Sequence, residues 1–138
     1  MASNPNEDLN AAFIQAAAYG LLEWAKQLIA SGADINGMPL LIAIQANHEA
    51  IVEELVAAGA DLNRAAVDTT PLVKAIQIRR PYLVHLLVHS GADVNLRTPN
   101  GITPLMAAHN PGRANATQAE EQEIISILKQ AGAQLPQE

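Results

Sequence analysis

A five-residue string of the form Gly-Ala-Asp-x-Asn recurs along the chain, and a chain that repeats itself folds as repeated structural units. Complete copies stand at residues 32–36, 59–63 and 91–95, and a shortened copy, Gly-Ala-Gln-Leu, stands at 132–135. Each copy follows a stretch in which apolar residues recur at positions i, i+1 and i+4, the pattern of one helix face. Because glycine adopts a positive φ at low cost, it is well suited to end a helix. We therefore predict that each repeat ends with an amphipathic helix and a glycine stop.

A second motif precedes these helices. Thr-Pro-Leu stands at residues 70–72 and 103–105, and Met-Pro-Leu at 38–40 is a variant of it. Threonine is a favourable N-cap and proline fits the first helical position, so the motif predicts the start of a short helix. Each unit is thus a short helix, a turn, a longer helix and a glycine stop. Since such a unit cannot bury its apolar face alone, stacked neighbours have to share one core.

The two motifs together resemble the ankyrin repeat, and the resemblance extends from about Leu9 to Leu135. It implies an all-α fold, an ankyrin-repeat solenoid of four helix-turn-helix units with short β-hairpin fingers. The second unit is six residues shorter than the family pattern and has lost its finger. The last unit is eight residues longer, which predicts a flexible loop at about residues 109–117. The expected units lie at about residues 5–36, 37–63, 64–95 and 96–135 of a single domain spanning 1–138.

The composition indicates how the core of such units is packed. Of the 138 residues, 26 are alanine and only four are aromatic, so we expect close helix contacts over small side chains. The candidates for these contacts are Ala16, Ala17, Ala43, Ala75 and Ala108. Trp24 stands at the position that Ile51 and Leu83 occupy in later units, which predicts a core residue. His48 lies between the two helices of the second unit, where we expect it to stabilise the turn.

Several classes of function are disfavoured by the residues present. A chain with no cysteine has no disulfide, no thiolate metal site and no cysteine nucleophile. His85 and His89 are four residues apart on a predicted helix and could hold a metal, but no third ligand stands near them in the sequence. With no catalytic constellation in the sequence, we expect no enzyme activity, no metal and no cofactor. No apolar run approaches the ~20 residues of a membrane span, and the polar residues 1–10 do not match a secretory signal, so a cytoplasmic location is expected.

The charge is unevenly distributed along the chain. The net charge is −6, which argues against nucleic-acid binding. Residues 64–113 carry six basic and two acidic residues, a local balance of +4, and the rest of the chain carries −10. This distribution is either an ordinary scatter of surface charge or a basic stripe that suits an acidic partner surface.

The resemblance implies a non-catalytic protein–protein interaction module that serves as an adaptor, an inhibitor or a sequestering subunit. In the family, the fingers and the exposed side of the short first helices form a concave binding face. Helical spacing and finger positions place ten residues of this chain there, as an apolar patch with a basic rim, unless the apolar ones pack between neighbouring units. The predicted partner-binding residues are Tyr19, Ile42, Gln45, Arg64, Val67, Lys74, Gln77, Ile78, Arg79 and Arg97.

We expect the partner to be another protein with an acidic surface, and the free chain to be a monomer. Neither a membrane nor a nucleic acid is expected as a partner. The alternative function is that of a structural or assembly subunit that docks through an end of the solenoid. Docking of that kind needs apolar ends. Lys129, at the next expected apolar position of the last helix, counts against this alternative.

Overall fold

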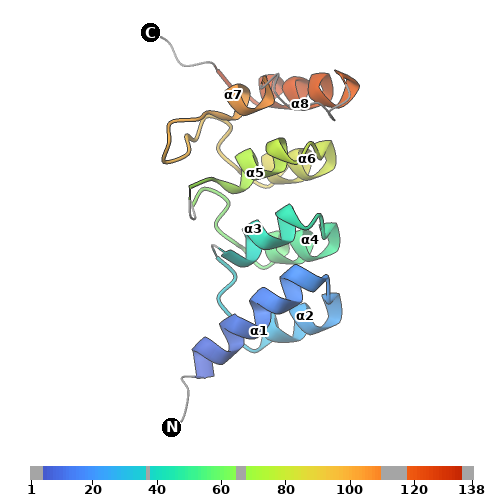
Figure 1. Cartoon of the computed structure of the whole chain (residues 1–138), viewed down its shortest axis with the longest axis vertical. Coiled ribbons are helices and arrows are strands. Elements are labelled where there is room, and N and C mark those ends of the chain that lie inside the picture. Colours follow the sequence, from blue (N-terminus) through green and yellow to red (C-terminus); the bar gives the residue numbers. More distant parts are fainter. Residues whose placement is uncertain (1–4, 37, 65–67, 110–117, 135–138) are drawn as a thin grey trace. The chain divides into compact units, whose positions relative to one another are not determined.

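The computed structural model describes residues 5–36, 38–64, 68–109 and 118–134, and these residues form helices joined by turns, with no β-strand (Figure 1). The all-helical prediction is thereby confirmed. The eight helices among the described residues are α1 (Pro5–Tyr19), α2 (Leu22–Ala30), α3 (Met38–Gln45), α4 (Glu49–Ala57), α5 (Pro71–Gln77), α6 (Pro81–His89), α7 (Pro104–Ala108) and α8 (Gln118–Gln130).

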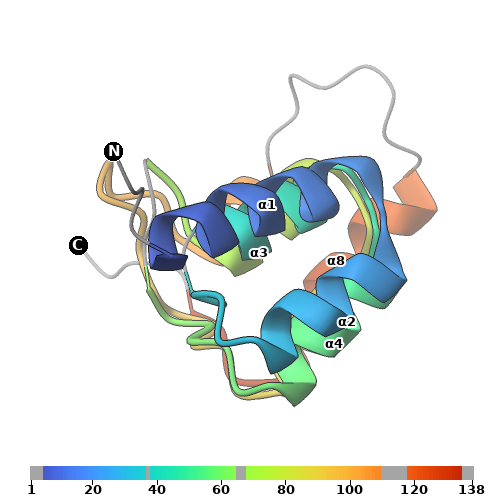
Figure 2. The same ribbon diagram turned by 90° about the horizontal axis from the view of Figure 1, so that it is seen from below.

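The contacts divide the chain into two compact parts, the N-terminal part Met1–Asp61 and the C-terminal part Leu62–Glu138. In the N-terminal part, α1 packs on α2 and α3, and α4 packs on α2 and α3; Figure 2 shows α1 over α3 and α2 over α4. In the C-terminal part, α5 packs on α6 and α7, and α8 packs on α6 and α7. Each part therefore consists of two consecutive helix pairs. That the whole chain is one domain of four units stays a prediction.

The short helices begin where the Thr-Pro-Leu motif predicts. The Thr70 side chain accepts a hydrogen bond from the Val73 N–H, over 3.2 Å between Oγ1 and N, and Pro71 occupies the first helical turn of α5. Thr103 caps α7 in the same way, with Pro104 as its first residue. The motif thus satisfies one backbone N–H that the helix itself cannot bond.

The glycines end the longer helices as predicted. Gly32, Gly59, Gly91 and Gly132 have φ between 91° and 106°, a conformation that other residues adopt only with strain. Beyond two of these stops, the Asp side chain of the motif folds back on its own turn. The Asn36 N–H donates to the Asp34 carboxylate over 3.0 Å, and the Asn95 N–H donates to the Asp93 carboxylate over 2.9 Å.

Asparagine side chains join consecutive units. The Asn36 amide oxygen accepts a hydrogen bond from the Asp61 N–H over 2.6 Å in the N-terminal part, and the Asn63 amide oxygen accepts one from the Asp93 N–H over 2.6 Å in the C-terminal part. We refer to the four bonds of this kind as the asparagine links. Asn95 likewise joins two consecutive pairs through the Gln134 N–H over 2.8 Å, whereas Asn10 of α1 makes the same kind of bond within the first pair, to the Asp34 N–H over 2.8 Å.

Alanines are buried in the core at the positions where the composition predicts close helix contacts. All five of the alanines expected at such contacts are fully buried. Larger apolar side chains fill the rest of each core. Those that are fully buried include Phe13, Leu40, Ile44, Ile51 and Leu55 in the N-terminal part, and Ile76, Leu83, Leu87, Ile124 and Leu128 in the C-terminal part.

The prediction that Trp24 is a core residue is wrong. Its side chain is 36% exposed, whereas Ile51, at the equivalent position of α4, is 1% exposed. Ile51 lies on α4, which packs on both α2 and α3. Trp24 belongs to the first helix pair, ahead of which the described residues place no further pair to cover it.

The His48 side chain, which follows α3, contacts the end of α1; that it stabilises its own turn stays a prediction. Its Nε2 atom lies 3.2 Å from the Ala18 carbonyl oxygen, within hydrogen-bond distance. The imidazole ring is packed so closely against Gly20 that a Cβ added there would lie 2.7 Å from its Cε1 atom. Gly20 has a φ of 72°, so both its backbone and its neighbour require glycine.

We predict that Gly20→Ala destabilises the protein by about 2–4 kcal/mol, from backbone strain together with the collision with the His48 ring. In a His48→Ala background only the backbone term remains, so the same substitution is expected to cost about 1–2 kcal/mol. Urea unfolding of the four proteins of this double-mutant cycle measures the difference. An equal cost in the two backgrounds would contradict the contact.

Candidate functional site

The N-terminal part contributes three of the predicted binding residues, all on the first helix of a pair. Tyr19, the last residue of α1, is 74% exposed, which confirms its predicted accessibility. Gln45, the last residue of α3, is exposed as well, and Ile42, three residues earlier, is half-buried. The exposed sides of α1 and α3 thus carry these uncharged side chains.

The C-terminal part contributes a second, more basic group. Lys74, Gln77 and Ile78 follow the i, i+3, i+4 spacing along α5 and its C-cap, and all three are half-buried. Arg64 and Arg97 are exposed. Val67 lies outside the described residues, as do 110–117 of the predicted loop at 109–117. These residues belong to the C-terminal part, whereas Tyr19, Ile42 and Gln45 belong to the N-terminal part.

The prediction that Arg79 is an exposed rim residue is wrong. Its side chain is only 8% exposed, and Nη1 donates a hydrogen bond to the Ala108 carbonyl oxygen, at the end of α7, over 3.1 Å. Arg79 has a φ of 60°, so its side chain leaves the backbone in a direction that a helical residue would not give. The bond is favourable because helix C-termini carry unpaired carbonyl groups and negative partial charge. Gly20 and Asn47 occupy the equivalent position in the earlier units. A glycine and an asparagine at that position were the sequence signal that Arg79 has a positive φ.

Arg97 is carried by a hydrogen-bonded turn. The Gly101 N–H donates to the Thr98 carbonyl over 2.8 Å, and the Thr98 N–H donates to the Ile102 carbonyl over 2.9 Å. The Ile102 N–H donates in turn to Thr98 Oγ1 over 3.1 Å, and Thr98 is buried. These bonds close a tight turn without a strand on either side, and β-hairpin fingers stay a prediction. The turn holds the backbone beneath the exposed Arg97.

The structure also exposes apolar side chains that the sequence reading missed. Ile14, Leu21 and Trp24 of the first helix pair are 37%, 44% and 36% exposed. Leu41, at the position in α3 equivalent to Ile14, is 5% exposed. The second helix pair has a neighbour on this side, because α3 packs on α1. The described residues place no helix on the corresponding side of the first pair.

Other chemistry has little support among the described residues. His85 and His89 lie on α6 with ring centroids 3.9 Å apart, and both are exposed. The described part of the chain brings together no group of three or more histidines and carboxylates that could hold a metal ion. Within that part, too, no helix has both the length and the apolar character needed to cross a membrane.

We predict that Arg79→Ala destabilises the protein by about 2 kcal/mol, because it removes a charged hydrogen-bond donor that is buried. Alanine keeps a Cβ at the same positive φ, so the loss reports the side chain. Arg97→Ala is the matched control and is expected to change stability by less than about 0.5 kcal/mol, since that side chain is exposed. Urea unfolding compares the two, and an equally small change for Arg79 would contradict its structural role.

Comparison with known families agrees with the helix pairs and their caps. A model of ankyrin repeats in three copies matches residues 13–98, which is more than half of the chain. A comparison with curated proteins gives no match. The matched residues include Asn36 and Asn63. Each accepts a hydrogen bond from the N–H of a motif aspartate in the next helix pair. The chain belongs to the ankyrin repeat family.

Proposed function

We propose that this chain is a non-catalytic binding module that recognises a partner protein on a concave face built by its first helices and the turns between units. Ankyrin repeats are generally protein–protein interaction modules, which supports the proposal. The observation that carries it is the exposure of Tyr19, a 74% accessible aromatic side chain on the first helix of the N-terminal part. Tyrosine is among the residues that contribute most to binding at interfaces.

The proposed partner has an acidic surface. Arg64 and Arg97 are exposed and Lys74 is half-buried, so the C-terminal part contributes three cationic side chains and the half-buried apolar Ile78 to the proposed face. Charged rim residues set the association rate and the choice of partner more than the affinity itself. The role is that of an adaptor, an inhibitor or a sequestering subunit, with the free chain monomeric and located in the cytoplasm. The absence of cysteine fits a reducing compartment.

A second candidate function is docking through the end formed by the first helix pair. The exposure of Ile14, Leu21 and Trp24 favours it, because three large apolar side chains are left in water on one helix pair. Exposed Lys129 and Gln130 make the last helix polar by comparison. A docking end is therefore proposed only for the first helix pair.

We predict that Arg64→Glu, Lys74→Glu and Arg97→Glu together weaken partner binding by about tenfold or more while changing stability by less than about 1 kcal/mol. The partner is captured from the native source with the wild-type chain and its affinity is measured by biolayer interferometry. Lys129→Glu, which reverses an exposed charge on α8, is the control and is expected to bind as the wild type. Unchanged binding by the triple variant would mean that the concave basic face is the wrong surface.

Substitutions at the first helix pair separate the two candidates. We predict that Ile14→Gln with Trp24→Gln leaves the affinity for that partner within about twofold, because these side chains lie off the proposed face. Removing exposed apolar side chains is also expected to leave the unfolding midpoint nearly unchanged. Loss of binding in this double variant, with binding retained by the charge-reversed variant, would favour docking through the end.

A further inference from the structure

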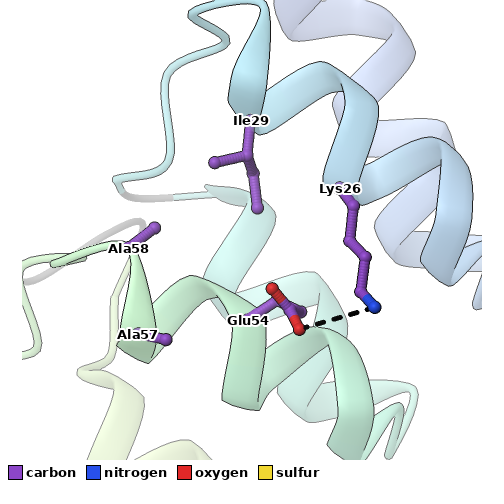
Figure 3. A pocket seen from close by; sticks show the side chains of 5 residues that line it. All are labelled: Lys26, Ile29, Glu54, Ala57 and Ala58. Atoms are coloured by element: carbon purple, nitrogen blue, oxygen red, sulfur yellow. Dashed lines mark ion pairs between the residues drawn. The ribbon is translucent and has the colours of Figure 1, made fainter.

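A groove lies between α2 and α4 in the N-terminal part, with a volume of about 420 Å³ (Figure 3). Lys26 and Ile29 line it from α2, and Glu54, Ala57 and Ala58 line it from α4 and its C-cap. The two alanines are exposed, and their short side chains leave the space open beside half-buried Ile29. The groove is therefore apolar along Ile29 and the alanines and charged at one end.

The charges at that end are weakly paired. Lys26 Nζ lies 3.9 Å from Glu54 Oε1 and 4.0 Å from Glu23 Oε1, distances at the upper limit for an ion pair. All three side chains are substantially exposed, between 39% and 85%. Ion pairs of this kind contribute little to stability. A competing cation can therefore replace Lys26 at Glu54 at small cost.

The surroundings favour a cation further. Residues 1–61 contain eight acidic residues and one basic residue, a net charge of −7, and the one basic residue is Lys26 itself. A surface of one charge sign raises the local concentration of oppositely charged groups and speeds their association. The groove thus lies in the acidic part of the chain and contains the only side-chain cation there.

We propose that this groove binds an arginine side chain presented by a partner protein. Arginine fits both halves of the groove, because its aliphatic stem can cover apolar surface while its guanidinium stays at a charged edge. Here the stem lies along Ile29, Ala57 and Ala58, and the guanidinium donates to the Glu54 carboxylate. A guanidinium pairs with a carboxylate through two parallel hydrogen bonds, which an ammonium group cannot do.

This surface is separate from the one in the proposed function. The groove is formed by α2 and α4, whereas Tyr19, Ile42 and Gln45 lie on α1 and α3. The chemistry is also opposite, since the groove selects a basic group and the residues of the C-terminal part select an acidic one. A negative result for one proposal would therefore not count against the other.

The test uses the full chain labelled with ¹⁵N and the peptide acetyl-Gly-Ala-Arg-Ala-Gly-amide as the probe. Saturable shifts are expected at the amides of residues 26–30 and 54–58. The same peptide with citrulline, which has the shape of arginine without its charge, is expected to bind about tenfold more weakly. A lysine peptide is expected to bind more weakly than the arginine peptide, because it lacks the paired donors.

Two variants, each of which removes one negative charge, test whether the peptide binds in the groove. Glu54→Gln is expected to weaken binding of the arginine peptide about tenfold, whereas Glu53→Gln, one residue away and outside the groove lining, is expected to leave it within about twofold. Ala57→Leu, which fills the groove at an exposed position, is expected to abolish the saturable shifts. The amide spectra and unfolding midpoints verify that each variant is folded.

Three results would overturn the proposal. Equal weakening by Glu53→Gln and Glu54→Gln would mean that the peptide responds only to the overall negative charge. The absence of saturable shifts, or their location outside the groove, would mean that the groove is not the site. Shifts of the same amides that depend on protein concentration without peptide would identify a second copy of the chain, and not a partner protein, as the occupant.

Discussion

The asparagine links are the constraint on which the repeated structure depends. Each joins an asparagine to a backbone N–H between 24 and 39 residues further along the chain, over only 2.6–2.8 Å between oxygen and nitrogen. The number of residues between the partners differs from unit to unit, yet the geometry of the bond is almost the same. In three of the four links the two partners lie in consecutive helix pairs, so a short side chain fixes the offset of one pair on the next. Insertions and deletions therefore have to be accommodated elsewhere in each unit.

The elements that depend on local chemistry could be predicted from the sequence, and the failures have a common physical origin. Thr70 caps its helix and Gly32 stops one because the hydrogen bonds and dihedral angles involved are set within a few residues. The exposure of Trp24 depends on whether another helix pair covers it, and the burial of Arg79 depends on a single positive φ. Neither is encoded in the helical periodicity that assigned these residues.

Some features of the candidate site could be predicted from the sequence, and others could not. The exposure of Tyr19, Arg64 and Arg97 could be predicted, because helical spacing and turn residues determine which side chains face water. The groove between α2 and α4 could not be predicted. Alanines in this chain are expected at tight contacts, and Ala43 and Ala75 are fully buried, whereas Ala57 and Ala58 leave a hollow because they follow one another at the exposed end of α4. Alanine therefore allows close packing at one position and leaves a groove at another, and the two cases differ only in where the residue lies in three dimensions.

The division of charge bears on which kind of binding module this is. The N-terminal part carries a net charge of −7, while residues 62–138 carry seven basic and six acidic residues, a net charge of +1. An inhibitor or a sequestering subunit needs one surface matched to one partner, and a uniform charge would favour the approach of that partner. Two proposed surfaces that select opposite charges fit a chain that holds two different partners at once. We therefore extend the proposal: two surfaces that select opposite charges suit an adaptor better than an inhibitor.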